Sequence, residues 1–149
     1  MKRASGFSRL CKAPCVAALL LLAASCGNGK ALKDGVYQGK SGPDDRGAWG
    51  EVTLTIKDGK AGACTFVTRQ KDGTVKGKEY GMINGEISSA DYYEKAQLAV
   101  RAMDAYAAQF VETGSIQAVE AVSGATIAYN QFAEAASEAL DAARKRSGP

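Results

Sequence analysis

The sequence predicts an α+β domain: a small antiparallel sheet, built around a hairpin, with two helices packed on one face. Apolar residues alternate with threonines in the first half of the chain, and an Asp-Gly pair, Asp58-Gly59, separates two strand-like segments. In the second half the apolar residues recur every three or four positions, which is the period of amphipathic helices. Two helices laid across one face of the sheet bury both apolar surfaces.

The strands are expected between residues 34 and 80. Residues 36–37 belong to a short first strand, and the turn-forming residues of 41–47 predict a loop after it. Residues 52–56 alternate as a half-buried strand does, and residues 60–69 supply the strand that returns from the Asp-Gly turn. Residues 75–80 are expected to form another short strand or an extended loop.

Cys64 and Phe66 share one face of the returning strand. A small sulfur-bearing side chain beside a buried aromatic ring is typical of a core position. We therefore expect Cys64 to be a core residue and not a reactive thiol.

Two helices are expected in the second half. The first covers about 22 residues from Ala90, with Ser88 as its N-cap, and Thr113-Gly114-Ser115 ends it. The second runs from about Ala128 to Arg144, with basic residues at the end where the helix dipole favours cations.

The N-terminal segment is interpreted as a targeting signal and not as part of the folded domain. Residues 1–25 combine basic residues with an apolar stretch over 13–25, too short for a membrane span of about 20 residues. The sequence before Cys26 resembles a bacterial lipobox, with Ala23 where a leucine is usual. The resemblance implies a lipoprotein signal peptide, a lipid on Cys26, a tether over residues 26–33 and an extracytoplasmic, membrane-anchored domain. Which membrane holds the lipid stays open.

Removing this segment changes the charge and the cysteine count. The whole chain carries +3, but residues 1–25 hold four basic residues and no acid, so the remainder carries −1. A nucleic-acid partner is not expected. Cys64 is the one cysteine left beside Cys26, so no internal disulfide is expected.

Near the C-terminal end the chain reads Glu120-Ala121-Val122-Ser123-Gly124-Ala125-Thr126 at the entrance of the last helix. This run resembles the attachment motif of the FMN-binding domain family, with Glu120 where an aspartate is usual. Segments at 34–39, 50–60, 93–96 and 119–132 follow the family's order. The resemblance implies an FMN-binding domain over residues 34–146, with FMN held by a phosphodiester to Thr126, which a separate flavin transferase installs.

The residues around Thr126 suit that chemistry. The start of a helix offers unpaired amides to a phosphate, and Gly124 and Ala125 leave room for close approach. Ser123 and Glu120 complete the candidate cofactor-binding set, and Tyr80 and Tyr129, with Trp49 and Tyr37, are weaker candidates to stack on the flavin. A plainer reading makes Ser123 or Thr126 a helix cap.

Elimination narrows the chemistry further. The chain contains no histidine, so the usual ligands of zinc, haem and copper are lacking, and we expect neither a metal site nor a catalytic residue. Redox work would therefore rest on an organic cofactor.

Three functions remain open for the chain. The first is a carrier that passes electrons between unknown partner proteins through covalent FMN, and the second a non-covalent FMN-binding or delivery lipoprotein. The third is a flavin-free surface lipoprotein. An independent enzyme has the least support.

A cluster of basic residues is expected on the strands and the loop after them. It either protects the strand edges from pairing with other chains or serves as a docking patch for a redox partner. The cluster consists of Lys57, Lys60, Arg69, Lys71, Lys76 and Lys78.

Overall fold

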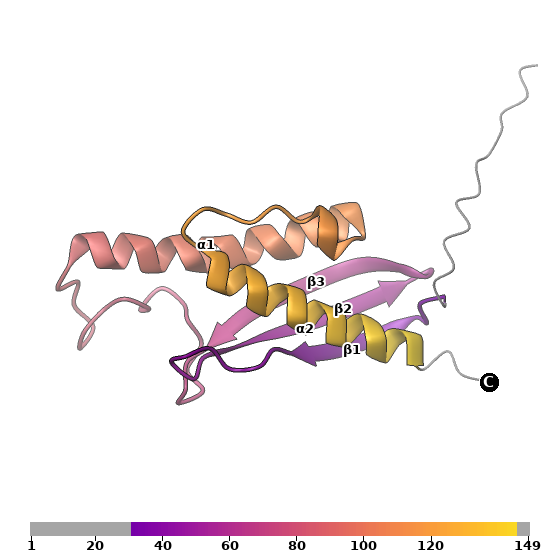
Figure 1. Cartoon of the computed structure of the whole chain (residues 1–149), viewed down its shortest axis with the longest axis horizontal. Coiled ribbons are helices and arrows are strands. Elements are labelled where there is room, and N and C mark those ends of the chain that lie inside the picture. Colours follow the sequence, from indigo (N-terminus) through magenta and orange to yellow (C-terminus); the bar gives the residue numbers. More distant parts are fainter. Residues whose placement is uncertain (1–30, 146–149) are drawn as a thin grey trace, which may run out of the picture.

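The computed structural model describes residues 31–145. Figure 1 shows three strands, followed by two long helices with a short 3-10 helix between them. The predicted signal peptide, Cys26 and most of the tether lie outside the described residues. The elements are β1 (Gly35–Lys40), β2 (Trp49–Lys57), β3 (Lys60–Arg69), α1 (Ala90–Thr113), η1 (Ile116–Ala118) and α2 (Thr126–Lys145).

The sheet is a meander in the order β1-β2-β3, and both pairings are antiparallel. Asp58 (φ 52°) and Gly59 (φ 72°) are both left-handed, as a two-residue hairpin with the twist of its strands requires. Of the two alternatives for residues 75–80, the structure has the extended loop. Its contact with the sheet is one bridge between Val75 and Arg69 and a hydrogen bond from Lys76 N to Thr68 O.

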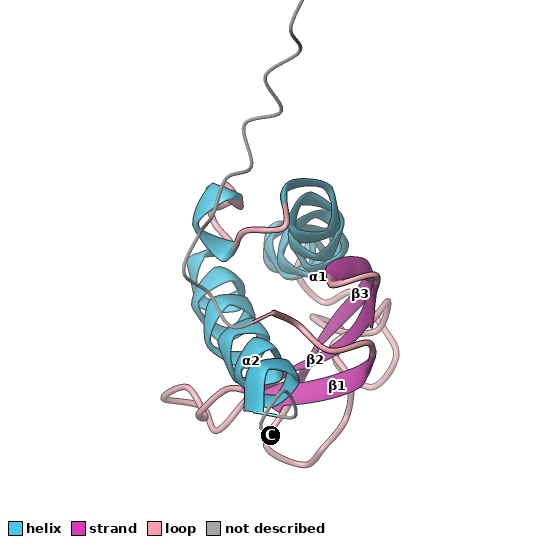
Figure 2. Ribbon diagram, turned by 90° about the vertical axis from the view of Figure 1, so that its right-hand side faces the viewer, coloured by secondary structure: helices cyan, strands magenta, loops and turns pink. Residues whose placement is uncertain are grey.

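Both helices cover one face of the sheet, which confirms the predicted layers (Figure 2). α2 lies across β1 and β2, while α1 lies along β3. The alternating residues of β2 that point at the helices, Val52, Leu54 and Ile56, are at most 2% exposed. Phe66 of β3 and Phe132 of α2 meet edge to face, with 5.3 Å between ring centroids, in the middle of this core.

α2 approaches β1 closely at a glycine. A methyl group on Gly39 would lie 1.9 Å from the carbonyl oxygen of Ala135 and 2.6 Å from the amide nitrogen of Ala139. One residue further along the strand, the Lys40 amide donates to Glu138 Oε2 at 2.6 Å. The first strand and the last helix are thus joined by direct backbone contact.

The helix ends differ slightly from the expected ones. Ser89, and not Ser88, caps α1: its hydroxyl accepts from the Tyr92 amide at 3.4 Å. The capping geometry needs an extended residue just before the first turn, and Ser89 is that residue (φ −143°). Gly114 ends the helix in the left-handed conformation, as expected. α2 begins two residues before the predicted Ala128, because the carbonyl of Ala125 already accepts from the Tyr129 amide.

Cys64 is half-buried against the core, as the sequence predicts. Burial raises the pKa of its thiol to about 11. The reactive species is the thiolate, and a raised pKa keeps the group protonated at neutral pH. Cys64 is therefore expected to resist iodoacetamide at pH 8 in the folded protein and to react on unfolding. Mass spectrometry of the alkylated protein with and without denaturant checks this; equal labelling in both states would contradict it.

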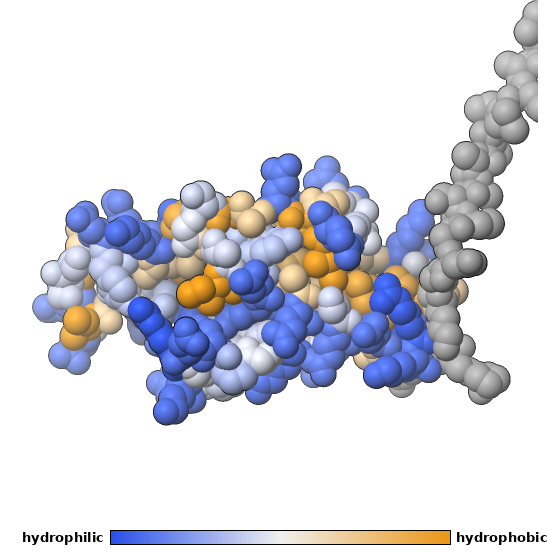
Figure 3. Space-filling view, in the orientation of Figure 1, coloured by the Kyte–Doolittle hydropathy of each residue, from blue (hydrophilic) through white to orange (hydrophobic). Residues whose placement is uncertain are grey.

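The surface carries no extended hydrophobic area on the face seen in Figure 3, where orange residues form small separate patches among hydrophilic ones. Within residues 31–145 no helix is both long and apolar enough to cross a membrane. The same residues contain no cluster of acidic or cysteine side chains able to hold a metal ion.

Candidate functional site

The segment that precedes α2 forms a tight turn over residues 122–125. The Ala125 amide donates to the Val122 carbonyl at 2.9 Å, and Ser123 and Gly124 occupy the two central positions. Gly124 has φ +85°, which the third position of a type II turn requires. A methyl group there would also come within 3.1 Å of Leu98 on α1. Glycine thus serves both the backbone conformation and the close approach of the turn to α1.

One buried hydroxyl fastens this turn to the core. Tyr106, in the middle of α1, is fully buried. Its hydroxyl accepts from the Val122 amide at 3.0 Å and donates to the Ala125 carbonyl at 3.3 Å. The side chain therefore holds both ends of the turn, while its ring packs against Tyr129 and Phe132.

Replacing Tyr106 with phenylalanine keeps the ring and removes this link. The Val122 amide then loses its partner, while the Ala125 carbonyl keeps the Tyr129 amide, and we expect the change to cost roughly 1–3 kcal/mol of the free energy of unfolding. Hydrogen exchange of the Val122 amide should rise as well. Denaturant titration and exchange measurements check both effects. Tyr92→Phe, at the exposed end of the same helix, is the control. Exchange at Val122 that does not change would contradict the role.

Thr126 is the first residue of α2, and its side chain is exposed. The residue before it is Ala125, whose methyl group cannot cap a helix. Among the described residues no first-turn amide of α2 donates a hydrogen bond to the hydroxyl of Ser123 or Thr126. The amides at this helix start are thus left for an external acceptor, and an anion is the acceptor that such an end favours.

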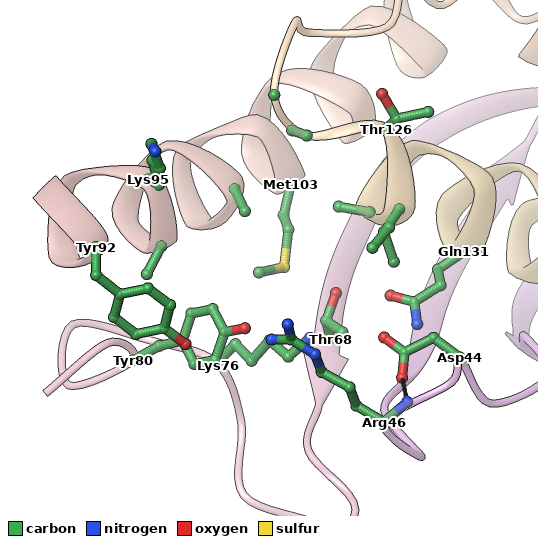
Figure 4. Close-up of a pocket in the computed structure, with 16 residues that line it drawn as sticks. Asp44, Arg46, Thr68, Lys76, Tyr80, Tyr92, Lys95, Met103, Thr126 and Gln131 are labelled. Atoms are coloured by element: carbon green, nitrogen blue, oxygen red, sulfur yellow. Dashed lines mark hydrogen bonds between the residues drawn. The ribbon is translucent and has the colours of Figure 1, made fainter. Parts of the chain in front are cut away.

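Beside Thr126 lies a pocket of about 340 Å³ between the two helices and the loops at the end of β3 (Figure 4). Thr126 stands on one rim, and Tyr80 and Tyr92 stand on the opposite side. Small or flexible apolar side chains form much of the walls, and Thr68 and Gln131 are buried polar residues among them. The pocket is lined by Asp44, Arg46, Thr68, Lys76, Tyr80, Tyr92, Lys95, Ala96, Ala99, Met103, Gly124, Ala125, Thr126, Ile127, Ala128 and Gln131.

The chain after β3 folds back to build one side of this pocket. Gln70 and Thr74 close a turn, and the hydrogen bond from Lys76 N to Thr68 O lays the returning segment along the strand. Gln97 of α1 then holds the loop, because its side-chain amide donates to the carbonyls of Gly77 (3.1 Å) and Tyr80 (2.9 Å). Lys76 and Tyr80 are thereby fixed at the pocket.

The loop between β1 and β2 builds another side. The Asp44 carboxylate accepts from the amides of Arg46 (2.9 Å) and Ala48 (2.8 Å), which closes the loop on itself. Gln131 links α2 to this loop, because its side-chain amide nitrogen donates a hydrogen bond to the Ala48 carbonyl at 2.8 Å. Asp44 thus closes the loop predicted over residues 41–47, and it also lines the pocket.

Cationic side chains predominate around the pocket. Arg46, Lys76 and Lys95 line it together with a single carboxylate, that of Asp44. Burial lowers the pKa of Lys76, whose ammonium lies 5.1 Å from the centre of the Tyr80 ring. Burial also raises the pKa of Tyr80, which keeps that hydroxyl protonated. The site therefore favours an anionic ligand with a flat, partly apolar body.

The predicted cofactor residues fall into two groups. Gly124, Ala125, Thr126 and Tyr80 line the pocket. Ser123 and Glu120 are exposed and do not line it, and the Glu120 amide donates to Gln109 Oε1 toward the far end of α1. Tyr129 packs on Tyr106 and does not line it either. The other two aromatic candidates are remote. Tyr37 is buried in the core between the sheet and the helices, where its hydroxyl donates to the Lys33 carbonyl, and Trp49 lies on the outer face of the sheet.

Other residues of the site were not predicted as such. Lys76 was assigned to the basic cluster, whereas Thr68, Tyr92, Met103 and Gln131 were not singled out. Two of them carried a signal: Thr68 continues the buried alternation of Cys64 and Phe66, and Gln131 stands on the apolar stripe of α2. A polar side chain at a buried position needs a hydrogen-bond partner, so it indicates either an internal hydrogen bond or a ligand.

A family model described as the FMN-binding domain matches residues 47–141, which is more than half of the chain. The chain belongs to the FMN-binding domain family. FMN is therefore its cofactor, and the match includes all of the lining residues except those of the Asp44–Arg46 loop.

The fold of this FMN-binding domain also occurs in a known crystal structure, that of the CPE2226 protein from Clostridium perfringens. The two share 20% sequence identity with a TM-score of 0.61, over 77% of this chain and 91% of the other. At that identity the likeness concerns the fold. A search of curated proteins found no match.

The pocket of this FMN-binding domain fits its cofactor chemically. Two side-chain atoms inside it, Thr68 Oγ1 and Gln131 Oε1, are buried without a hydrogen-bond partner among the described residues. A bound molecule with polar groups on its edge would satisfy them. Apolar walls, tyrosine rings and nearby cations suit a flat ring that carries a phosphate.

Proposed function

We propose that this protein is a membrane-anchored, extracytoplasmic electron carrier whose FMN is joined to Thr126 through a phosphodiester. The observation that carries the proposal is that Thr126 is exposed and lines the pocket, at a helix start without a side-chain cap. Family membership adds the cofactor.

The chain itself lacks what is needed to form such a bond. It has no histidine, and no side chain among the described residues hydrogen bonds to the Thr126 hydroxyl. A flavin transferase would activate the hydroxyl. With a flavin dinucleotide as donor, the threonine oxygen forms a new bond to the flavin-side phosphorus as the pyrophosphate bond breaks. AMP leaves, and the hydroxyl proton passes to a base of the transferase.

Bound FMN supplies reversible one- and two-electron transfer. The first-turn amides of α2 would hold the phosphate, and Ala96, Ala99 and Met103 would exclude water from one face of the ring. Arg46 and Lys76 would favour negative charge in the pocket. No residue of the site forms a nucleophile and base pair, so the domain is suited to carry electrons for partner proteins.

The anchor and the location rest on the sequence before the domain. The apolar stretch, the lipobox-like residues and Cys26 support a lipidated N-terminus in a bacterial membrane. Outside the cytoplasm no flavin pool refills a loose site, so a covalent bond would keep the carrier loaded. The partners that donate and accept electrons are proteins of that compartment.

Intact-mass measurement on protein from a host with a flavin transferase tests the proposal. The expected result is a mass increase of one FMN less one water, together with yellow fluorescence that persists on an acid denaturing gel. Material that is yellow when native but loses the flavin in denaturant supports the non-covalent alternative. Colourless, unmodified protein from that host would overturn the proposal. A diacylglyceryl-type mass on Cys26 tests the anchor separately.

A further inference from the structure

We propose that Thr68 and Gln131 bind the imide edge of the flavin ring and thereby select a flavin whose N3 carries a hydrogen. Gln131 Oε1 would accept from N3–H, and the Thr68 hydroxyl would donate to a carbonyl beside it. The proposal rests on the proposed function only in placing the ring in this pocket, and it does not need the bond at Thr126.

The first observation is that both atoms are buried without partners. Thr68 is 1% exposed and Gln131 is 5% exposed, and Thr68 Oγ1 and Gln131 Oε1 are the two buried side-chain polar atoms that lack a hydrogen bond within residues 31–145. Leaving such a group unpaired is costly, so native proteins keep few of them. Both residues line the same pocket, although they come from different elements, β3 and α2.

The second observation fixes what each atom can do. A carbonyl oxygen only accepts, so the 2.8 Å contact with Ala48 O identifies the Gln131 nitrogen and leaves the oxygen free as an acceptor. Figure 4 shows this oxygen on the side of the amide where Arg46 and Thr68 lie, and the Thr68 hydroxyl pointing into the pocket. The pair therefore offers one acceptor and one hydroxyl that can donate.

These two groups match one edge of the isoalloxazine ring. At that edge an N–H donor stands between two carbonyl acceptors, whereas the opposite, dimethylbenzene edge offers no polar group. The acceptor of Gln131 suits the N–H and the hydroxyl of Thr68 suits an adjacent carbonyl. Arg46 and Lys76, which line the same pocket, suit the negative charge that collects at this edge on reduction.

Pairing with water is the competing explanation, because buried polar atoms are often satisfied by ordered solvent. The two explanations differ in selectivity. A hydrated pocket binds flavins with and without a hydrogen on N3 equally well. A pocket that pairs with N3–H rejects a ring methylated there, because Gln131 Oε1 would lose its partner and meet a methyl group.

The experiment uses the full chain made without a flavin transferase, so that Thr126 is unmodified. Lumiflavin and 3-methyllumiflavin are titrated into it, and binding is followed by the change in flavin fluorescence. We expect the wild type to bind lumiflavin roughly tenfold or more tightly than the methylated ring. Gln131→Met and Thr68→Val should weaken lumiflavin binding, and Gln131→Met should abolish the preference. Thr65→Val on β3 and Asn130→Met on α2 are the matched exposed controls and should bind as the wild type does.

A second measurement separates binding from structural support. In the flavin-free chain, Thr68→Val removes an unpaired buried hydroxyl without changing the side-chain shape, so its melting temperature should equal or exceed that of the wild type. A hydroxyl kept for structural reasons would lower it. Equal affinity for the two flavins, no binding of either one, or a Thr68→Val protein that binds lumiflavin normally would overturn the proposal. Attachment of FMN at Thr126 is measured separately, by the intact mass of protein coexpressed with a flavin transferase. Failure of the pairing proposed for Thr68 and Gln131 is therefore distinguishable from failure of the attachment proposed for Thr126.

Discussion

Thr126→Val is expected to yield a folded protein that carries no covalent flavin. Valine has nearly the shape of threonine but no hydroxyl, so no phosphodiester can form at this position. Because the Thr126 side chain is exposed and no described residue hydrogen bonds to it, the change should alter the free energy of unfolding by no more than about 0.5 kcal/mol. Coexpression with a flavin transferase, followed by intact-mass measurement and an unfolding titration, checks both parts.

Two neighbouring changes make this result specific. Ser123→Ala removes the other hydroxyl of the turn and should leave the flavin mass in place. Thr126→Ser retains a hydroxyl at the helix start and should be modified, although less completely, since serine lacks the methyl group that restricts its rotamers. Covalent flavin on the Thr126→Val protein would show that the attachment residue lies elsewhere.

Gly39→Ala is expected to have the largest effect on stability of any single methyl group added in the described chain. The new carbon would lie 1.9 Å from the Ala135 carbonyl oxygen and 2.6 Å from the Ala139 nitrogen, and both are backbone atoms that no rotamer change can move. α2 and β1 must therefore separate. We expect a loss at or above the upper end of the roughly 1–3 kcal/mol typical of overpacking. That corresponds to a fall in melting temperature of about 10 °C or more.

Gly62→Ala on β3 is the matched control. Its added methyl group would meet only ordinary contacts, 3.6 Å to Lys57 and 3.7 Å to Thr55. Alanine in a strand is favoured over glycine by roughly 0.5–1 kcal/mol, so this protein should be equally or slightly more stable. Thermal denaturation of the two variants side by side checks the pair. A Gly39→Ala protein that melts with the wild type would mean that α2 does not pack this closely on β1.

The sheet and the helices were readable from local patterns because each of them is specified by neighbouring residues. The Asp58-Gly59 turn follows from two residues with left-handed preference, and the burial of Val52, Leu54 and Ile56 follows from their alternation. The start of α2 was harder to place. Ala125 has no side chain that can cap a helix. The turn that ends at Ala125 is held by a hydrogen bond from the Tyr106 hydroxyl, 19 residues earlier in the chain.

The segment around Thr126 could be singled out from the sequence, but the pocket that it lines could not. The residues that line the pocket come from four separate stretches of the chain. Lys76 lines it because the loop after β3 turns back along the strand, where the Lys76 amide donates to the Thr68 carbonyl. The amino-acid composition of this loop does not predict that it folds back along β3. Thr68 and Gln131 were not singled out either, although each interrupts an apolar pattern with a polar side chain and could have been found by that signal.

The contact between Gly39 and Ala135 also constrains the order in which the molecule can be made. β1, β2 and β3 are joined by short connections and can pair early, but β1 has its main packing partner in the last helix, almost a hundred residues further along the chain. Contacts of such long range form slowly, because a long loop must close first. A ribosome or a translocation channel that still holds the last residues would therefore hold back completion of the core. The helix that completes the core begins with Thr126, so the domain becomes compact and brings the proposed attachment residue to the pocket in the same step.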